Sequence, residues 1–299
     1  MASASRERHF VVSSGPVQLT SILGQLAPGD SDALAQGRVF VDGKRAYPDT
    51  NEVTVGSRVT WVAARSVQPP RGDLDFKVLD RRDHLIVVAK PAAWSSEPDR
   101  SGNTMSLREQ VKNRLKLRDV HIVTRLDCGV SGLVLIAVGE EACRQSTTLQ
   151  NEGRVTKQYL AIAACPMRGN ETWTQSVDGT RSARSECHPL AQSPCVRFSA
   201  AFETPASLLR IDAVTGRHHQ IRVHAASNGH ALLGDRRHGG PSQFVMSDGT
   251  VRPLSRPLLH AFRLKIHLPG QTWTTTCDVP ADMRRWWGEL GGTDCWPTS

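Results

Sequence analysis

The chain has 299 residues, 39% hydrophobic and 22% charged, a composition typical of a folded globular protein and not of a disordered one. Its net charge of +8 favours a polyanionic partner without proving one. The seven cysteines are scattered and contain no C-x-x-C pair, which argues against a disulfide framework and a cysteine zinc site. No apolar run reaches the roughly 18 residues that a membrane span needs. We therefore expect an intracellular protein, cytoplasmic or mitochondrial, with only a weak organellar signal at its start.

The first part of the chain predicts a tail and a small folded module. Residues 16–36 contain two short helical patterns, and GRVFVDGKRA at 37–46 is typical of a strand that enters a turn at Asp42-Gly43. EVTVGSRVTWVA at 52–63 adds two short strands separated by Gly56-Ser57. We expect a tail over 1–15, a module over 16–65 and a proline-containing linker over 66–79, best marked by SVQPPRGD.

The next part predicts a larger domain over 80–290, followed by a tail over 291–299. It begins with a strand, DHLIVVAKP at 83–91, which Pro91 ends. Further along come the strand LVLIAV, a polar helix over 140–150 and a strand over 155–163. Strands and helices mixed in this way favour an α+β domain over regular βαβ repeats.

A basic helix is predicted over 106–118. Ser106 and Glu109 have the spacing of a capping box at its start. Its exposed side carries basic residues, Lys112 and Lys116 among them. Such charge indicates either an ordinary solvated surface or contacts with a phosphate backbone, and both interpretations stay open.

HIVTRLDCGVSGLVLIA at 121–137 joins two apolar stretches through a short polar turn that holds Arg125 and Asp127. An aspartate in a glycine-rich turn often only caps its own backbone. The pattern GVSGL lacks the final glycine of a nucleophile elbow, and no P-loop, G-x-G-x-x-G or H-E-x-x-H motif occurs. A hydrolase that uses Asp127 with histidines therefore lacks a recognised nucleophile–base spacing.

GRHHQIRVHAASNGHALLGD at 216–235 predicts a polar helix that starts near Gly216 and stops at Gly229. In such a helix His218 and Arg222 share one face, as do Gln220 and His224. These groups suit an anion or a nucleobase, although an ordinary surface helix is an equal alternative. The histidines have no acidic neighbour in the sequence, so we expect no metal site.

Together these segments resemble the RluA-type pseudouridine synthases. The family signature H-R-L-D-x-x-T-S-G is matched by TRLDCGVSG at 124–132. Further matches follow in family order, covering roughly residues 80–285: HLIVVAKPAA, KQYLA, GRHHQIRVH, NGHALLGD, and LLHAFRLKIHLP followed by VPADM. The resemblance implies a mixed, largely antiparallel central sheet flanked by helices, preceded by a small α+β RNA-binding-like module.

The resemblance also implies an RNA pseudouridine synthase, an isomerase that acts on specific uridines in structured rRNA or tRNA and needs no cofactor. Asp127 would be the catalytic carboxylate, Arg222 the cation that keeps it ionised, and Tyr159 the residue that stacks on the uracil and assists proton transfer. The RNA would be bound by the remaining residues of the proposed site: Arg125, which would fill the space of the flipped base, Ile221 as an apolar wall, and Arg217, His219, Gln220, Lys112 and Lys116.

Four positions depart from the family pattern: Thr124 replaces the signature His, Val130 the following Thr, His218 the Thr before His-Gln-Ile-Arg, and Ala93 a usual Gly. They leave open an altered substrate, or a catalytically silent RNA-binding or ribosome-assembly factor on the same fold. The first module resembles a ribosomal-protein-type RNA-binding module, but QLTSILGQL carries no Lys or Arg, which favours a degenerate module. We expect a monomer that binds RNA, with ribosome-assembly partners as a further option.

Overall fold

The computed structural model describes residues 7–30, 33–34, 38–46, 50, 52–62, 75–98, 106–177, 182–268 and 270–297. The chain divides into two compact units, the first formed by Met1–Gly72 with Ser95–Leu117 and the second by Asp73–Trp94 with Arg118–Ser299. Of the linker predicted over 66–79, residues 66–74 lie outside the described residues, and the last part is wrong, because a strand begins at Lys77. Segment 95–117 groups with the first unit, whereas the sequence placed it in the large domain.

The first unit contains a small antiparallel sheet with the strand order β1-β6-β3-β4. Its strands are β1 (Glu7–Val11), β6 (Arg58–Val62), β3 (Val39–Val41) and β4 (Lys44–Arg45), and a second pair is β2 (Val17–Gln18) with β5 (Glu52–Val53). The turn predicted at Asp42-Gly43 is confirmed, since both residues have positive φ between β3 and β4. The tail predicted over 1–15 is wrong in part, because residues 7–11 form β1, which pairs with β6 along its whole length.

The described part of this unit includes helices α1 and α2. Helix α1 (Leu19–Leu26) buries Leu19, Ile22 and Leu26 and carries no basic residue in its last turn. Part of the second helical pattern predicted within 16–36 lies outside the described residues. Helix α2 (Leu107–Arg114) has the predicted cap, because the Ser106 hydroxyl accepts a hydrogen bond from the Glu109 amide at 3.3 Å. The helix ends before residue 118, since Lys116 has φ +53° in a left-handed turn.

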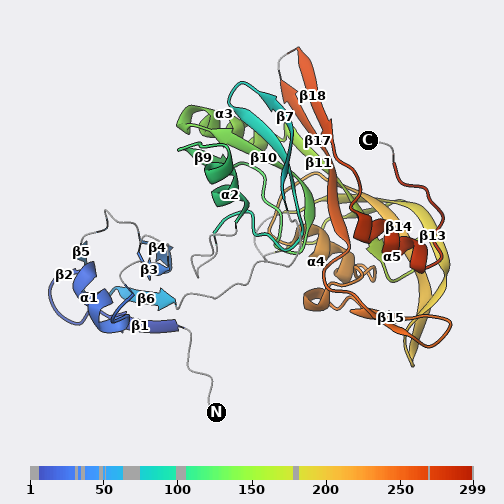
Figure 1. The fold of residues 1–299 in the computed structure, drawn as a ribbon, viewed down its shortest axis with the longest axis horizontal. Helices are drawn as coiled ribbons and strands as arrows, with labels where there is room; N and C mark the ends of the chain where they lie inside the picture. The colour runs from blue at the N-terminus through green and yellow to red at the C-terminus, as the bar shows by residue number, and fades with distance from the viewer. Residues whose placement is uncertain are drawn as a thin grey trace. The chain divides into compact units, whose positions relative to one another are not determined.

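The second unit contains a twelve-stranded sheet with the main order β16-β15-β13-β14-β11-β17-β10-β8-β7 (Figure 1). Among the described strand pairs, β10 with β17 is the single parallel one, so the predicted mixed and largely antiparallel sheet is confirmed. The strands are β7 (Lys77–Arg82), β8 (Leu85–Lys90), β9 (Val120–Ile122), β10 (Ser131–Val138), β11 (Val155–Ala163), β12 (Glu171–Trp173), β13 (Ser185–Ser199), β14 (Phe202–Ala213), β15 (Gln243–Val245), β16 (Val251–Pro253), β17 (Leu259–Leu268) and β18 (Gln271–Thr276).

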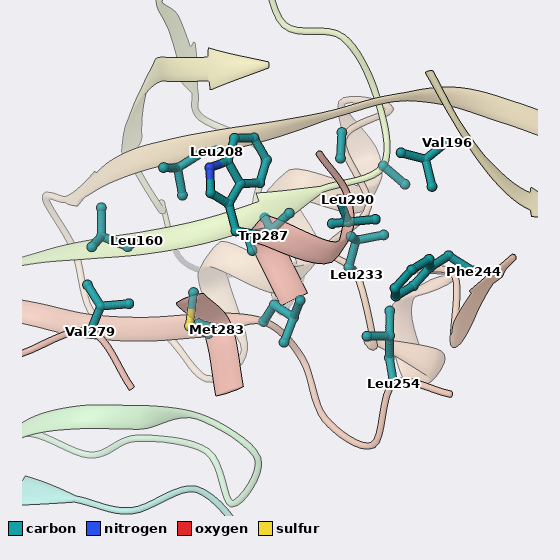
Figure 2. Close-up of a cluster of buried hydrophobic side chains, with 14 of the residues drawn as sticks. Leu160, Val196, Leu208, Leu233, Phe244, Leu254, Val279, Met283, Trp287 and Leu290 are labelled. Carbon is teal, nitrogen blue, oxygen red and sulfur yellow. The ribbon is translucent and has the colours of Figure 1, made fainter. Parts of the chain in front are cut away.

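Helices cover the sheet of the second unit, namely α3 (Glu140–Asn151), α4 (Gln220–Ser227) and α5 (Ala281–Glu289), with a short 3₁₀ turn at Arg236–His238. Within the described residues, no helix is long and apolar enough to cross a bilayer. Met283 and Trp287 of α5 pack with Leu160 and Leu208 in one buried cluster (Figure 2). This cluster fixes the face of the sheet that α5 covers.

The opposite face of the sheet carries α4. Along β11 the side chains alternate, so Tyr159 points away from the face on which Leu160 joins the α5 cluster. The strand register places Tyr159 beside Ile211, and Ile211 beside Cys187, on the face that also holds Ser185. The Ser185 hydroxyl is bonded by the side chains of two α4 residues, both at 3.0 Å. Tyr159 therefore lies on the α4 side of the sheet.

Candidate active site

The turn that carries Asp127 lies between β9 and β10. The Val130 amide donates to the Asp127 carbonyl at 3.0 Å, which closes the turn. Gly132 follows with φ +120°, and a Cβ there would lie 2.2 Å from the carbonyl oxygen of Ala261 on β17. Only glycine allows this approach, because an added Cβ would overlap the backbone of the parallel partner. The sequence thus forces the Asp127 turn against β17.

Two buried basic side chains, Lys90 and Arg256, bond the backbone of the same turn. The Lys90 ammonium donates to the carbonyls of Trp94 at 2.6 Å and Cys128 at 3.5 Å. Arg256, paired with Asp282, donates to the Gly129 carbonyl at 3.4 Å. Burial lowers the pKa of Lys90 to about 7. Such contacts limit the movement of the Asp127 carboxylate.

Thr124 and Ala93 show how the chain accommodates two departures from the family signature. Thr124 is fully buried, and its hydroxyl accepts a hydrogen bond from the Leu135 amide at 2.9 Å. Ala93, at a usual glycine position, has φ +73° and accepts a hydrogen bond from the Cys128 thiol at 3.1 Å. An alanine in this left-handed conformation is strained by roughly 1–2 kcal/mol. Both residues therefore have structural roles around the turn.

Asp127, Arg222 and Asp235 form a charged chain at the centre of the site. Arg222 donates through Nη1 to Oδ2 of Asp127 at 2.9 Å, and through Nε and Nη2 to both oxygens of Asp235 at 2.7 Å. The exposed fraction is 19% for Asp127, 10% for the Arg222 side chain and 1% for Asp235. Burial disfavours the Arg222 cation, but its hydrogen bonds with Asp235 and Asp127 outweigh this and raise its pKa above the usual value.

Asp235 is the site residue that the sequence analysis missed. It ends NGHALLGD, a segment matched to the family without a role for its aspartate. Its two-oxygen pairing with Arg222 fixes the guanidinium plane, as planar Arg–carboxylate pairs do. Its signal in the sequence is its place at the end of that family-matched segment.

The helix that supplies Arg222 begins later than predicted. Helix α4 starts at Gln220, because His219 before it has φ +56°, and its predicted stop is confirmed by Gly229 at φ +78°. His218 therefore lies outside the helix and shares no helical face with Arg222. Gln220 and His224 do share a face, since both contact the Ser185 hydroxyl.

His219 is the third group at the Asp127 carboxylate. Its Nε2 lies 3.6 Å from Oδ2 of Asp127, while its Nδ1 lies 3.1 Å from Nε2 of His238. The ring of His218 stacks on that of His219 with centroids 3.9 Å apart. Burial lowers the pKa of His219 to about 4, so this imidazole is neutral near pH 7. These histidines have no acidic neighbour in the sequence, but folding brings Asp127 to His218 and His219.

The other residues assigned to RNA binding fall into two groups. Gln220 is buried, and its amide bonds the Thr215 hydroxyl, the Arg217 amide, the Arg184 carbonyl and the Ser185 hydroxyl. With its donors and acceptor engaged, Gln220 braces the loop before α4, and the structure does not favour its role as an RNA ligand. Ile221 is 6% exposed, and Arg217 contacts the Ser182 carbonyl at 3.3 Å. Arg125 is exposed beside Asp127, and Lys112 and Lys116 are exposed on the first unit.

Tyr159 lies on β11, and one strand, β17, separates it from the β10 strand that follows the Asp127 turn. Its strand partner on β17 is Ala261, which is also the partner of Gly132 on β10. Two strand spacings therefore separate Tyr159 from Gly132, about 10 Å. Tyr159 is 6% exposed and lies on the face that α4 covers. Asp127 is in direct contact with Arg222 and with His219, whereas Tyr159 lies on β11, which β17 separates from β10.

A cysteine, histidine and glutamate also meet on the second unit. His230 contacts the Cys165 sulfur through Nδ1 at 2.6 Å and the Glu171 carboxylate through Nε2 at 3.0 Å. Burial raises the pKa of Cys165 to about 12, so the sulfur stays a thiol at neutral pH. The thiolate is the reactive form of cysteine, and this cluster therefore does not supply an activated nucleophile. Asp127 remains the candidate reactive group of the site.

Comparison with known proteins gives a family match and bacterial relatives. The family model described as RNA pseudouridylate synthase matches residues 84–227. The ribosomal large subunit pseudouridine synthase C of Escherichia coli is 31% identical over 273 residues, covering 83% of each chain. The dual-specificity RNA pseudouridine synthase RluA of Escherichia coli is 31% identical over 217 residues, covering 69% of this chain and 93% of the relative.

A solved structure shows the same fold. Human RNA pseudouridylate synthase domain containing 1 aligns with a TM-score of 0.54 at 21% identity, covering 71% of this chain and 86% of that one. The family match includes the Asp127 turn, Tyr159 and Arg222, and ends at the last residue of α4. The segment that supplies Asp235 lies beyond the matched residues.

Proposed function

This chain belongs to the RNA pseudouridylate synthase family and is an RNA pseudouridine synthase, and from that premise we propose that Asp127 is its catalytic carboxylate. The observation that carries the proposal is the contact at 2.9 Å between Asp127 and Arg222, whose other nitrogens are held by buried Asp235. An ionised carboxylate, fixed by a cation and open to solvent, is what the reaction requires.

The reaction breaks the bond between N1 of uracil and C1′ of ribose and forms a bond between C5 and C1′. One proton leaves C5 and one is gained at N1, so the product is an isomer of the substrate. Asp127 acts at C1′, as the nucleophile or as the charge that stabilises the electron-poor sugar. Arg222 donates a hydrogen bond to Oδ2 of Asp127. None of the described residues donates to Oδ1 of Asp127, so this oxygen is left for the sugar.

Tyr159 is proposed to stack on the flipped uracil and to assist the proton transfer from C5. Its side chain lies on the α4 face, on β11, and β17 lies between β11 and the β10 strand that follows the Asp127 turn. A base placed between Asp127 and Tyr159 would have its sugar at the carboxylate and its ring against the phenol. Ile221, buried at the start of α4, is proposed as the apolar wall of this space.

The proposed substrate is a uridine in structured rRNA or tRNA. Relatives named for the large ribosomal subunit favour rRNA, and the dual-specificity relative keeps other RNA open. A base within a duplex must leave the stack before chemistry, and exposed Arg125 next to Asp127 is placed to fill the gap. We propose a monomeric enzyme, with ribosome-assembly partners as a further option. The alternative of a catalytically silent factor is not favoured, because Asp127, Tyr159 and Arg222 are all retained.

Pseudouridine mapping across total RNA, with and without this protein, tests the proposed substrate. We expect one or a few uridines to lose their pseudouridine signal when the protein is absent and to regain it with the wild-type chain. Regain must fail with Asp127→Asn. An unchanged map, together with no conversion by the purified protein on rRNA and tRNA, would overturn the proposed substrate.

A further inference from the structure

Asp127 belongs to a second arrangement that the isomerase reaction does not use. One ligand atom from each of Asp127, His218 and His219 lies within 4.8 Å of the other two. His218 is exposed, while His219 and Asp127 are partly buried, so the group opens to solvent on one side. Two imidazoles and one carboxylate form a donor set typical of transition metals and not of Mg²⁺ or Ca²⁺.

The surroundings of His219 favour a ligand role for its inner nitrogen. His238 faces Nδ1 of His219 at 3.1 Å, which leaves Nε2 directed at Asp127. Metal-binding histidines commonly donate their other ring N–H to a neighbour, and His238 can accept that proton. In the tautomer of His219 that carries its proton on Nδ1, the Nε2 lone pair faces a carboxylate oxygen 3.6 Å away. In that tautomer two acceptors face each other, and a cation can lie between them.

The charge around Asp127 is compatible with a cation. Arg222 is shared between Asp127 and Asp235, so one positive charge opposes two negative charges in this chain of contacts.

We propose that Asp127, His218 and His219 bind a divalent transition metal ion of the zinc type, and that the bound ion reversibly inhibits the enzyme. Ligand bonds of about 2.0–2.2 Å require the three side chains to close around the ion, and exposed His218 has room to move. The ion would occupy the Asp127 oxygens and the space of the ribose. The inhibition rests on the proposed role of Asp127, whereas the binding of the ion does not.

His218 makes this property specific to this chain. The resemblance places Thr at position 218 in the family, and His218 has no catalytic or RNA-binding role in the proposed function. His218→Thr therefore removes one ligand while Asp127, Arg222 and His219 stay in place. His267→Thr is the matched control, because it removes another exposed histidine from β17, outside the cluster.

The first test measures binding with the metal alone. Co²⁺ and Zn²⁺ are titrated into the full-length protein without RNA, followed by visible absorption for Co²⁺ and by calorimetry for Zn²⁺. We expect one site in the wild type and in His267→Thr, with affinity weakened at least about tenfold in His218→Thr. Wild-type affinity in His218→Thr, or no binding by the wild type, would overturn the inference whatever the role of Asp127.

The second test measures inhibition as tritium release from 5-tritiated uridine in RNA at increasing Zn²⁺. Wild type and His267→Thr should lose activity over the range in which they bind Zn²⁺, and a chelator should restore it. His218→Thr should keep its basal activity and need at least about tenfold more Zn²⁺ for half-inhibition. Equal inhibition of all three proteins would refute the inhibitory site. Activity in Asp127→Asn would instead refute the proposed catalytic role, while the Co²⁺ spectrum still reports on the site.

Discussion

Arg222 carries the electrostatics of the site at the scale of single residues. It is 8% exposed and joins buried Asp235 to the more accessible Asp127. Breaking a buried ion pair by removing one partner is strongly destabilising, because an uncompensated charge stays behind. Arg222 thus stabilises the fold through Asp235 and orients the carboxylate through Asp127.

Arg222→Ala should lower both activity and stability, the latter by about 3–5 kcal/mol. Arg125→Ala removes an exposed cation from the same turn, so its effect on the free energy of unfolding should stay within about 0.5 kcal/mol. Chemical denaturation of both variants at pH 7 measures the difference. Equal stability of the two variants would mean that Arg222 is not a buried partner of Asp235.

Individual residues show what the sequence can and cannot reveal. The resemblance predicted the pairing of Asp127 with Arg222, residues 95 apart in the chain, and the contact at 2.9 Å confirms it. The dominant partner, Asp235, was missed because local spacing does not reveal which distant carboxylate a buried guanidinium meets. Gln220 was assigned to RNA for its amide, but that amide is used by backbone and hydroxyl groups brought near by folding.

At the scale of elements, the parallel pair β10–β17 positions the catalytic turn. Ser131 and His260 are partners in this pair, and the Ser131 hydroxyl contacts Nδ1 of His260 at 2.9 Å. The other ring nitrogen of His260 lies 3.3 Å from the Cys277 sulfur. Burial lowers the pKa of His260 to about 3, so the ring is neutral in the folded protein.

This buried histidine predicts a loss of stability in acid. The unfolded state binds a proton at His260 near pH 6.5 and the folded state only near pH 3, so stability falls as the pH drops through this window. The slope for one proton is at most about 1.4 kcal/mol per pH unit. Between pH 6.5 and 4.5 the wild type should lose up to about 3 kcal/mol more than His260→Gln.

Denaturation at several pH values, with His267→Gln as the control on the same strand, measures that difference. The control should follow the wild type, because His267 is exposed. A wild type and a His260→Gln variant with parallel pH profiles would show that His260 takes up its proton equally in both states.

Elements were predicted well where one local pattern decides them. The strands predicted at 83–91, 133–138 and 155–163 are continuous apolar or alternating segments. The structure confirms them as Leu85–Lys90, Ser131–Val138 and Val155–Ala163. Helix ends were harder, because left-handed residues that are not glycine set them, His219 before α4 and Lys116 after α2. Neither histidine nor lysine signals such a conformation in a sequence.

At the scale of the whole molecule, the net charge of +8 predicts an affinity for RNA that falls as the salt concentration rises. Lys112 lies on α2 and Lys116 just after it, and both are exposed. If both contact phosphates, replacing them with Gln should flatten the log–log salt dependence of affinity by about 1.4, at about 0.7 for each contact on single-stranded RNA. Target and non-target RNA should be weakened alike, since phosphate contacts carry no base information.

Filter binding or fluorescence anisotropy at several salt concentrations measures these slopes. Tyr159→Phe is the contrasting variant, which should keep the wild-type slope and lose turnover. An unchanged slope with wild-type affinity in the double Gln variant would move the phosphate contacts to another surface, with the N-terminal module as the next candidate.

The organisation of the whole chain was predictable only in part. Motifs in family order indicated the fold and the reaction class, because those residues surround one site. The grouping of segment 95–117 with the first unit was not predicted, since it depends on contacts between segments distant in sequence. The small sheet also includes β1, although the sequence of residues 1–15 was interpreted as a tail.

The most direct measurement of the central claim is tritium release by Asp127→Asn on RNA that contains 5-tritiated uridine. The substitution keeps the size of the side chain and removes the charge that the reaction at C1′ requires. We expect release to fall to background, while RNA affinity and thermal stability stay close to those of the wild type. Substantial release by a folded, RNA-binding Asp127→Asn protein would contradict the assignment of Asp127 as the catalytic carboxylate.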